Sequence, residues 1–335
     1  MNRDTPGALT ELVRRIAVRG GPTVAVSPDS SFAALLLNLE RVALTRAAVI
    51  LSGEPGTGKT LLARVVHSLA AEGDRPFVRV RCSLRPETEI LSVLFGTDRD
   101  PVSGRLGAGA VQRAVGGTLV LEGIEDLPMV AQTWLVDLID ASVDPIDASL
   151  GSAENTADRF PRIVATSVLD PERAVEDADL QEDLYYLLGV FVGRVEPLRR
   201  RRSDLGALAR HFLERANQRH GTRVPGITDD ASTQLIRAPW HGNAPELRNV
   251  VERAAILAGH RRIGILDLPA LPDPVAASSV QRLIVPVGTT AADAERRLIL
   301  ATLEHTGFNK AEAARTLALD VKTIRNKLRS YGLPQ

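Results

Sequence analysis

Gly53-Glu54-Pro55-Gly56-Thr57-Gly58-Lys59-Thr60 matches the phosphate-binding pattern G-x-x-x-x-G-K-[ST], and the rest of the sequence is organised around it. The apolar run 47–51 before it is typical of a buried strand, and residues 61–70 after it have apolar side chains at helical spacing. In this context backbone N–H groups and the helix dipole face the phosphates, Lys59 reaches the β- and γ-phosphates, and Thr60 offers a hydroxyl to Mg²⁺. An accidental glycine-rich turn is disfavoured by both flanks. The stretch therefore predicts a site for a nucleoside triphosphate.

The composition is that of an ordinary globular protein, with no overall bias toward nucleic acid or lipid. Of the 335 residues, 44% are hydrophobic and 24% are charged, and the formal net charge is zero. Any basic surface must therefore be local. The single cysteine, Cys82, excludes an internal disulfide framework and is typical of a reducing compartment. No apolar run approaches the roughly 20 residues of a membrane span, and no signal-peptide pattern is present. We expect a cytoplasmic protein without membrane contact.

After the phosphate loop, strand patterns alternate with helical patterns. Further strands are expected at 77–82, 118–122 and 162–167, with helices between them. This alternation predicts an α/β fold with a parallel sheet and crossover helices. Ligands in such sheets bind outside the carboxyl ends of the strands, where both the phosphate loop and Glu122 are expected.

From residue 203 onward the pattern is helical. Six helices are expected there, at 205–219, 229–237, 246–258, 291–306, 310–317 and 321–331. The first three would form a small all-α lid, and the composition of 269–288 is that of a linker. The expected domains are a short N-terminal extension, the α/β subdomain, the lid, the linker and a C-terminal domain, at 1–26, 27–202, 203–268, 269–288 and 289–335.

The C-terminal helices have the pattern of a helix-turn-helix. Ala313 and Ala314 are small enough for two helices to approach closely, and a turn over 318–320 precedes the second helix, which Asp320 can cap. Four apolar residues are expected to form their shared core, namely Leu317, Leu319, Ile324 and Leu328.

Double-stranded DNA is the predicted partner of the second helix. Four positive charges lie within eight residues there, with no acid among them, at Lys322, Arg325, Lys327 and Arg329. Lys322, Thr323 and Asn326 are candidates for contacts to base edges. Arg325, Lys327 and Arg329 are candidates for contacts to phosphates. The alternative is a basic three-helix bundle with no role on DNA.

Several short motifs occur in the order in which one protein family carries them. They are Gly53-Glu54 with Gly56-Thr57-Gly58-Lys59, Leu94-Phe95-Gly96, Gly116-Gly117-Thr118-Leu119, Glu182-Asp183-Leu184-Tyr185, Pro197-Leu198-Arg199, Trp240 with Gly242-Asn243 and Glu246-Leu247, and the segment from Asn309-Lys310 to Leu333. Through them the chain resembles the sigma-54-dependent transcription activators, or bacterial enhancer-binding proteins, from about residue 27 to the end.

This resemblance implies an AAA+ ATPase core with a helical lid, followed by a Fis-type helix-turn-helix domain. It also implies ATP as the nucleotide and a homo-oligomeric ring that remodels the RNA polymerase sigma-54 holoenzyme. Fis-type domains act as dimers, for which the apolar face of the helix at 291–303 is the expected pairing surface.

The same resemblance identifies positions where this sequence departs from the catalytic pattern. In the family's second acidic motif an Asp holds Mg²⁺ through water and the next residue, Glu, polarises the attacking water. These positions are Glu122 and Gly123 here. Glu122 still reaches the metal shell, so Thr60 and Glu122 are the predicted Mg²⁺ ligands. Glycine cannot act as a base, a role worth roughly 10²–10⁴-fold. Glu125 or Asp126 are the possible substitutes.

Three further features depart from the family. The two arginine-finger positions hold Gln181 and Leu187, and the lid arginine is replaced by Pro245. A finger arginine is worth about 10³–10⁵-fold in other nucleotide hydrolases. The polymerase-contacting loop G-A-F-T-G-A, expected within 97–108, is shorter and has no aromatic residue. We therefore hypothesise nucleotide binding without efficient turnover, and we assign no catalytic residue.

The main prediction is a DNA-binding transcription regulator whose AAA+ core binds ATP as an assembly switch, with weak or absent hydrolysis. One alternative is a working sigma-54 activator with reassigned catalytic residues, which the altered loop and finger positions disfavour. The other is a P-loop ATPase or kinase with an incidental basic tail, which the helix-turn-helix disfavours.

Three other features are given structural interpretations. The run of four arginines, 199–202, is predicted to be a solvated loop leading into the lid rather than a nucleic-acid site. Trp240 and His241 are predicted to pack in the lid, and Cys82 in the core.

Overall fold

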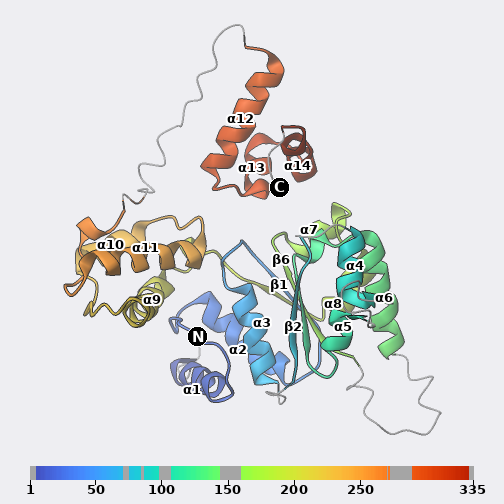
Figure 1. Ribbon diagram of the computed structural model, residues 1–335, viewed down its shortest axis with the longest axis horizontal. Helices are drawn as coiled ribbons and strands as arrows, with labels where there is room; N and C mark the ends of the chain where they lie inside the picture. The colour runs from blue at the N-terminus through green and yellow to red at the C-terminus, as the bar shows by residue number, and fades with distance from the viewer. Residues whose placement is uncertain are drawn as a thin grey trace. The chain divides into compact units, whose positions relative to one another are not determined.

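Figure 1 shows the computed structural model of the chain, which describes residues 5–70, 75–83, 87–97, 107–143, 160–269, 271 and 289–331. The chain divides into two compact units, residues 1–211 and residues 212–335. The central part of the predicted loop at 97–108, and almost all of the predicted linker at 269–288, lie outside the described residues.

The first unit contains a five-stranded sheet with the strand order β2-β5-β6-β1-β7, in which every pairing is parallel. Its strands are β1 (Val49–Ser52), β2 (Phe77–Arg81), β5 (Thr118–Glu122), β6 (Arg162–Ser167) and β7 (Phe191–Arg194). All residues of β1 and β6 are buried, as expected for central strands of a parallel sheet covered on both faces. The predicted α/β fold is confirmed.

Helices cover both faces of this sheet (Figure 1). On one side lie α1 (Thr5–Val18), α2 (Ser31–Ala43) and α3 (Lys59–Leu69). On the other side lie α4 (Glu87–Phe95), α5 (Ala110–Arg113), α6 (Met129–Val143) and α8 (Glu182–Leu188). A short helix α7 (Pro171–Glu176) follows β6, and β3 (Gly96–Thr97) pairs antiparallel with β4 (Gly107–Ala108).

The core on the α3 side explains why these segments form helices. Apolar side chains at helical spacing, including Leu36 and Leu39 of α2 and Leu62 and Val66 of α3, are fully buried against β1. The N-terminal helix α1 contributes Leu12 and Ile16 to the same core. Burial of a side chain of this size is worth about 1.5–3 kcal/mol, so this layer holds the helix that follows the phosphate loop firmly on the sheet.

The N-terminal cap of α2 is Ser30, whose hydroxyl accepts a hydrogen bond from Phe32 N–H at 3.0 Å. Cys82 was correctly predicted to be buried, and it lies at the end of β2 with 2% exposure.

The second unit is helical. The boundary falls inside α9 (Leu205–His220), which is followed by α10 (Asp229–Arg237), α11 (Asn243–Ala258), α12 (Ala291–His305), α13 (Lys310–Leu317) and α14 (Val321–Ser330). Trp240 is fully buried and its indole N–H donates to the carbonyl of Leu235 at 2.7 Å, which confirms its predicted packing in the lid. His241 is exposed, so its predicted packing in the lid was wrong. No helix in the described part of the chain is long and apolar enough to cross a membrane.

Candidate nucleotide site and nucleic-acid interface

The phosphate loop connects β1 to α3, and glycine is required at two of its positions. Gly53 has φ +148°, and a Cβ there would lie 2.4 Å from the carbonyl oxygen of Val195. Gly58 has φ +108° and occupies the cap position of α3. Both conformations strain any residue with a side chain. The predicted strand, glycine loop and helix therefore form as the motif requires, with the helix N-terminus at the loop.

Lys59 is held across this loop. Its ammonium donates to the carbonyl oxygens of Gly53 at 2.6 Å and Glu54 at 2.9 Å. Burial lowers the pKa of Lys59 to about 8, and the nearby carboxylates of Glu125, Glu122 and Glu54 oppose this shift. At neutral pH the side chain is therefore a largely charged, partly desolvated cation at the loop.

Thr60 and Glu122 come together although they are far apart in the sequence. The Thr60 hydroxyl donates to Glu122 Oε1 at 2.7 Å, which brings the start of α3 to the carboxyl end of β5. A hydroxyl and a carboxylate oxygen are ligands that Mg²⁺ prefers, so this pair fits the ion. The described residues contain no group of three or more His, Cys, Asp or Glu side chains that could hold a metal.

Two arginines that the sequence reasoning did not single out lie beside Glu122. Nε of Arg81 is 3.5 Å and Nε of Arg79 is 3.6 Å from Glu122 Oε2. The signal was available, because the alternation of strand 77–82 places residues 79 and 81 on one face. The two arginines were missed because the sequence does not show that this face of the strand meets Glu122.

The position expected to hold the catalytic base has no side chain, and Glu125, one of its two possible substitutes, is held elsewhere. Gly123 is in the left-handed region, with φ +75° and ψ +60°. Glu125 is buried, its Oε1 accepts a hydrogen bond from Val168 N–H at 2.7 Å, and burial raises its pKa. Among the described residues its Oε2 has no hydrogen-bond partner. Glu125 is therefore attached to the end of β6 and is a poor candidate for orienting water.

The two positions at which the family carries arginine fingers hold uncharged residues here. Gln181 occupies the N-cap position of α8 without a side-chain cap hydrogen bond. Its amide Nε2 donates to Thr133 Oγ1 at 2.9 Å, and its backbone N–H donates to Gln132 Oε1 at 2.8 Å. Gln181 is thus bound to α6 of its own chain. Leu187 is half-buried on α8, and Pro245 is exposed in the first turn of α11, where proline is tolerated.

The interpretation of residues 199–202 as a solvated loop was wrong for two of the four arginines. Arg199 donates two hydrogen bonds to the carboxylate of Glu54, at 2.7 and 2.5 Å. Arg201 is 5% exposed, and its Nη2 donates to the carbonyl of Thr57 at 2.5 Å. Both turn inward because the phosphate loop offers them acceptors. Arg200 and Arg202 are exposed, as predicted.

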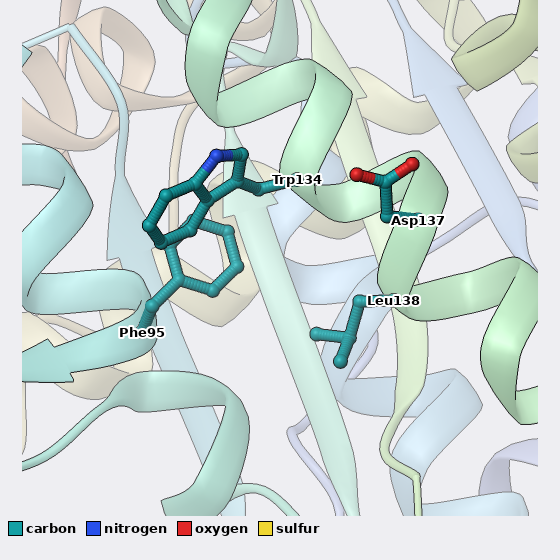
Figure 2. A pocket seen from close by; sticks show the side chains of 4 residues that line it. All are labelled: Phe95, Trp134, Asp137 and Leu138. Atoms are coloured by element: carbon teal, nitrogen blue, oxygen red, sulfur yellow. The ribbon is translucent and has the colours of Figure 1, made fainter.

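A hollow lies between α4 and α6 (Figure 2). It has a volume of about 290 Å³ and is lined by Phe95, Trp134, Asp137 and Leu138. The two rings pack at a centroid distance of 5.2 Å, and Asp137 is the one charged residue of the lining. Ligand sites need several convergent polar groups, which the phosphate loop supplies and this hollow does not. The phosphate loop is therefore the better candidate.

The C-terminal domain has the predicted core. Ala313 and Ala314 are buried with Ile324 and Leu328, and Leu317 and Leu319 pack against them. Ala318 ends α13 in the left-handed conformation, and Asp320 occupies the cap position of α14. Asp320 was expected to cap α14, but its side chain makes no cap hydrogen bond to the described helix.

The six candidate DNA-contacting residues lie on α14 with different exposures. Lys322, Asn326 and Arg329 are exposed, whereas Thr323, Arg325 and Lys327 are half-buried. Lys327 Nζ lies 2.5 Å from Glu295 Oε2 of α12, an ion pair that raises the pKa of Lys327. The exposed three are therefore better placed for DNA than Lys327.

The helix expected to pair two copies has most of its apolar face turned inward. Ile299 and Leu303 of α12 are buried in the domain's own core, while Leu298 is 46% exposed. The pairing surface remains a prediction, and Leu298 is the residue on this helix that would carry it.

Three successive segments of the chain match known protein families. Residues 25–192 match the Sigma-54 interaction domain, residues 199–281 match the AAA+ ATPase lid domain, and residues 290–331 match the bacterial regulatory proteins of the Fis family. The chain belongs to the sigma-54-dependent transcription regulators. The predicted family, and the main prediction of a transcription regulator with a Fis-type DNA-binding domain, are confirmed.

Relatives of this regulator cover most of its length. It is 33% identical over 311 residues to the transcriptional regulatory protein FlbD of Caulobacter vibrioides, which covers 88% of this chain and 67% of that protein. It is 36% identical over 312 residues to ZraR of Klebsiella oxytoca, covering 90% and 68%. The chain thus spans about two thirds of the length of these relatives. The structure of NtrX from Brucella abortus in complex with ADP matches with a TM-score of 0.63 at 25% identity, covering 97% of this chain and 73% of that chain.

Proposed function

We propose that this regulator binds ATP at the phosphate loop and keeps it as a bound ligand, with weak or absent hydrolysis. The proposal rests on a contrast within one site, between the residues that would bind the nucleotide and those at the positions expected to drive its hydrolysis. Lys59 and Thr60 are in position, with the Thr60 hydroxyl bonded to Glu122. The next residue, Gly123, has no side chain, and Gln181 is bound within its own chain. The NtrX structure with ADP supports nucleotide binding by this fold.

Thr60 and Glu122 are the residues that would hold Mg²⁺ beside the phosphates. The 2.7 Å hydrogen bond between them supports this assignment, because both oxygens would face one ion. The ion would add positive charge to the β- and γ-phosphates. The other proposed nucleotide contacts are the backbone of residues 53–58 and the ammonium of Lys59.

DNA is the proposed partner of α14. The exposed Lys322, Asn326 and Arg329 and the match to the Fis family support this assignment. We further propose a homo-oligomer, with a dimer through α12 and Leu298 and a ring through the AAA+ core. The match to the Sigma-54 interaction domain supports contact with the sigma-54 holoenzyme.

The test is ATP binding and multiple-turnover hydrolysis measured on one sample, with and without DNA. We expect saturable ATP binding that Lys59→Ala abolishes, and phosphate release no faster than in Lys59→Ala. Lys59→Ala removes the cation at the loop, whereas Lys310→Ala, on α13, is the matched control and should bind ATP normally. Sustained hydrolysis that disappears in Lys59→Ala would instead support the alternative, a working sigma-54 activator.

A second measurement separates the two functions at the level of the partner. Purified regulator is mixed with sigma-54 holoenzyme and an ATP transition-state analogue, and the complex is isolated by gel filtration. Our proposal predicts no stable complex that depends on the analogue, because the groups that respond to the transition state are replaced. An analogue-dependent complex would favour the working activator.

A further inference from the structure

The lid carries a hollow between α9 and α11, with a volume of about 540 Å³, which we call the lid hollow. Among the described residues its lining contains three arginines and one acid. On each helix the two charged residues are four positions apart, so they lie on one side of that helix. They are Arg215 and Arg219 of α9, and Arg248 and Glu252 of α11. The sequences of the two helices therefore gather these charges at one place.

The one acid of the lid hollow is already paired. Nη1 of Arg219 and Nε2 of His220 lie 3.2 and 2.7 Å from the same Glu252 oxygen, Oε1. The hydrogen bond with His220, together with the nearby Arg219, holds the pKa of Glu252 below its ordinary value. The carboxylate therefore stays ionised at neutral pH, and its charge is compensated by its neighbours.

Two arginines of the lid hollow are left without an acid. Arg215 and Arg248 are exposed, and neither forms an ion pair within the described part of the chain. The other acids of the two helices, Glu214 and Glu246, do not line the hollow. Three guanidinium groups thus face one carboxylate, so positive charge is in excess at this site.

The chemistry of this lining suits phosphate groups. A guanidinium presents its N–H donors in a planar fork that matches phosphate oxygens, and such charge-assisted hydrogen bonds are stronger than neutral ones. A duplex is far wider than a hollow of this volume, but phosphates of its backbone can meet the exposed side chains of Arg215 and Arg248.

DNA is favoured over an acidic peptide as the source of the negative charge. The chain already carries the DNA-binding helix α14, and the predicted linker, 269–288, joins the lid to the domain that contains it. A second contact with the same DNA is therefore intramolecular and gains from a high effective concentration. An acidic peptide has no such advantage.

We propose that the lid hollow is a second DNA contact of this regulator, in which Arg215, Arg219 and Arg248 bind phosphates of the backbone. The inference rests on the proposed function, in which α14 binds DNA. Glu252 is then a positioning residue that holds Arg219 at the hollow, not a contact to DNA. Phosphate contacts carry no sequence information, so the lid hollow adds affinity equally for specific and random DNA.

The experiment measures binding of the full chain to a fluorescein-labelled, random-sequence duplex of about 40 base pairs, by fluorescence anisotropy over a range of KCl concentrations. The double variant Arg215→Gln, Arg248→Gln should lower the slope of log affinity against log salt by about two, one for each lost phosphate contact. At about 0.1 M KCl it should bind about tenfold or more weakly than the parent. Because both residues are exposed, the thermal unfolding midpoint should stay that of the parent. If the double variant does not fold, Arg215→Gln alone should lower the slope by about one.

Two further variants make the result specific. The matched control is the double variant Arg237→Gln, Arg253→Gln, which removes two exposed arginines from α10 and α11 that do not line the hollow. It should change the slope by less than about 0.5, because separated surface charges are screened by salt. Arg329→Ala, on α14, should lower the slope by about one in the parent and in the lid variant alike, because the two contacts are independent.

Four outcomes would overturn the inference. Equal salt slopes for the parent and the lid variant, with Arg329→Ala still lowering the slope, would overturn it and leave DNA binding by α14 intact. An equal loss in the matched control would do the same, because the effect would then come from total charge. So would a fluorescein-labelled polyglutamate peptide that binds the parent but not the lid variant while the DNA slope is unchanged, since the hollow would then serve an acidic protein partner. A parent chain that does not bind DNA would overturn the proposed function and the inference with it.

Discussion

Gly123 decides the chemistry of the nucleotide site, and its backbone shows that this position is adapted to glycine. It has φ +75° and ψ +60°, and a Cβ there would lie 2.8 Å from Asp126 Oδ2. Side chains in the left-handed region cost roughly 1–2 kcal/mol. A glutamate reintroduced at this position would therefore have to overcome strain before it could act as a base.

This backbone difference gives a test with two glycines. Gly123→Ala is expected to destabilise the chain by about 1–2 kcal/mol, because of the positive φ. Gly206→Ala, near the start of α9 with open space around its Cα, is expected to be neutral or to stabilise by about 0.5–1 kcal/mol. Urea unfolding of both variants measures the difference, and equal stabilities would contradict the assigned conformation of Gly123.

The reactivity of Cys82, which follows β2 directly, tests how tightly this end of the sheet is packed. Its thiol is buried, and burial raises its pKa well above the ordinary value, so the reactive thiolate is scarce in the folded chain. We expect negligible reaction with a thiol reagent such as DTNB at pH 8 in native buffer. In denaturant the single cysteine should react stoichiometrically. Fast native labelling would show that the end of β2 is open, contrary to this packing.

At the scale of elements, the segment after β7 links the phosphate loop to α9. Arg201 and Asp204 are both buried, with Nη1 3.5 Å from Oδ2, and Arg201 also bonds the carbonyl of Thr57 and stacks over Phe32 at 4.5 Å. Asp204 accepts from Ser30 Oγ at 2.6 Å and from Ser27 N–H at 2.7 Å. This network ties the loop, the cap of α2 and the start of α9 together.

Two neighbouring arginines should therefore differ strongly on substitution. Arg201→Met leaves the Asp204 carboxylate buried without its ion partner, so we expect a loss of about 3 kcal/mol in the free energy of unfolding. Arg200→Met removes an exposed charge and should change it by less than about 0.5 kcal/mol. Chemical denaturation measures both. Similar effects for the two variants would favour the solvated-loop interpretation.

On the recognition helix α14, exposed residues of different chemistry should contribute differently to DNA binding. Asn326→Ala is expected to reduce discrimination between specific and random DNA, because an amide can read a base edge. Arg329→Ala should weaken binding equally for all sequences and lower the salt slope by about one. Fluorescence anisotropy at several salt concentrations separates the two effects. A sequence-specific effect of Arg329→Ala would reverse these assignments.

At the scale of the whole molecule, sequence reasoning succeeded where chemistry requires fixed residue types at fixed spacing. The phosphate loop, the strand ending in Glu122 and the core of the helix-turn-helix were all predicted, because each follows from local periodicity or a short motif. The edge strand β7 (Phe191–Arg194) was not predicted, because it is short and contains Gly193, which weakens the strand pattern.

Contacts between distant residues could not be predicted in the same way. Arg199 and Arg201 turn inward because Glu54 and Thr57, 145 and 144 residues earlier, accept their hydrogen bonds. Likewise, Arg79 and Arg81 lie beside Glu122 only because β2 and β5 pair in this register. A local pattern shows that these residues are charged, but only the fold shows which partner each one meets.

The most direct test of the central claim is the fate of ATP bound by excess protein in a single turnover. The full chain is incubated with ATP labelled at the γ-phosphate, with and without DNA, and the bound nucleotide is recovered by filtration and separated by chromatography. We predict that the bound nucleotide is still intact ATP after an hour, because a base worth roughly 10²–10⁴-fold and a finger worth about 10³–10⁵-fold are missing. Conversion of bound ATP to ADP within seconds to minutes would contradict the proposal that this regulator keeps ATP as a bound ligand.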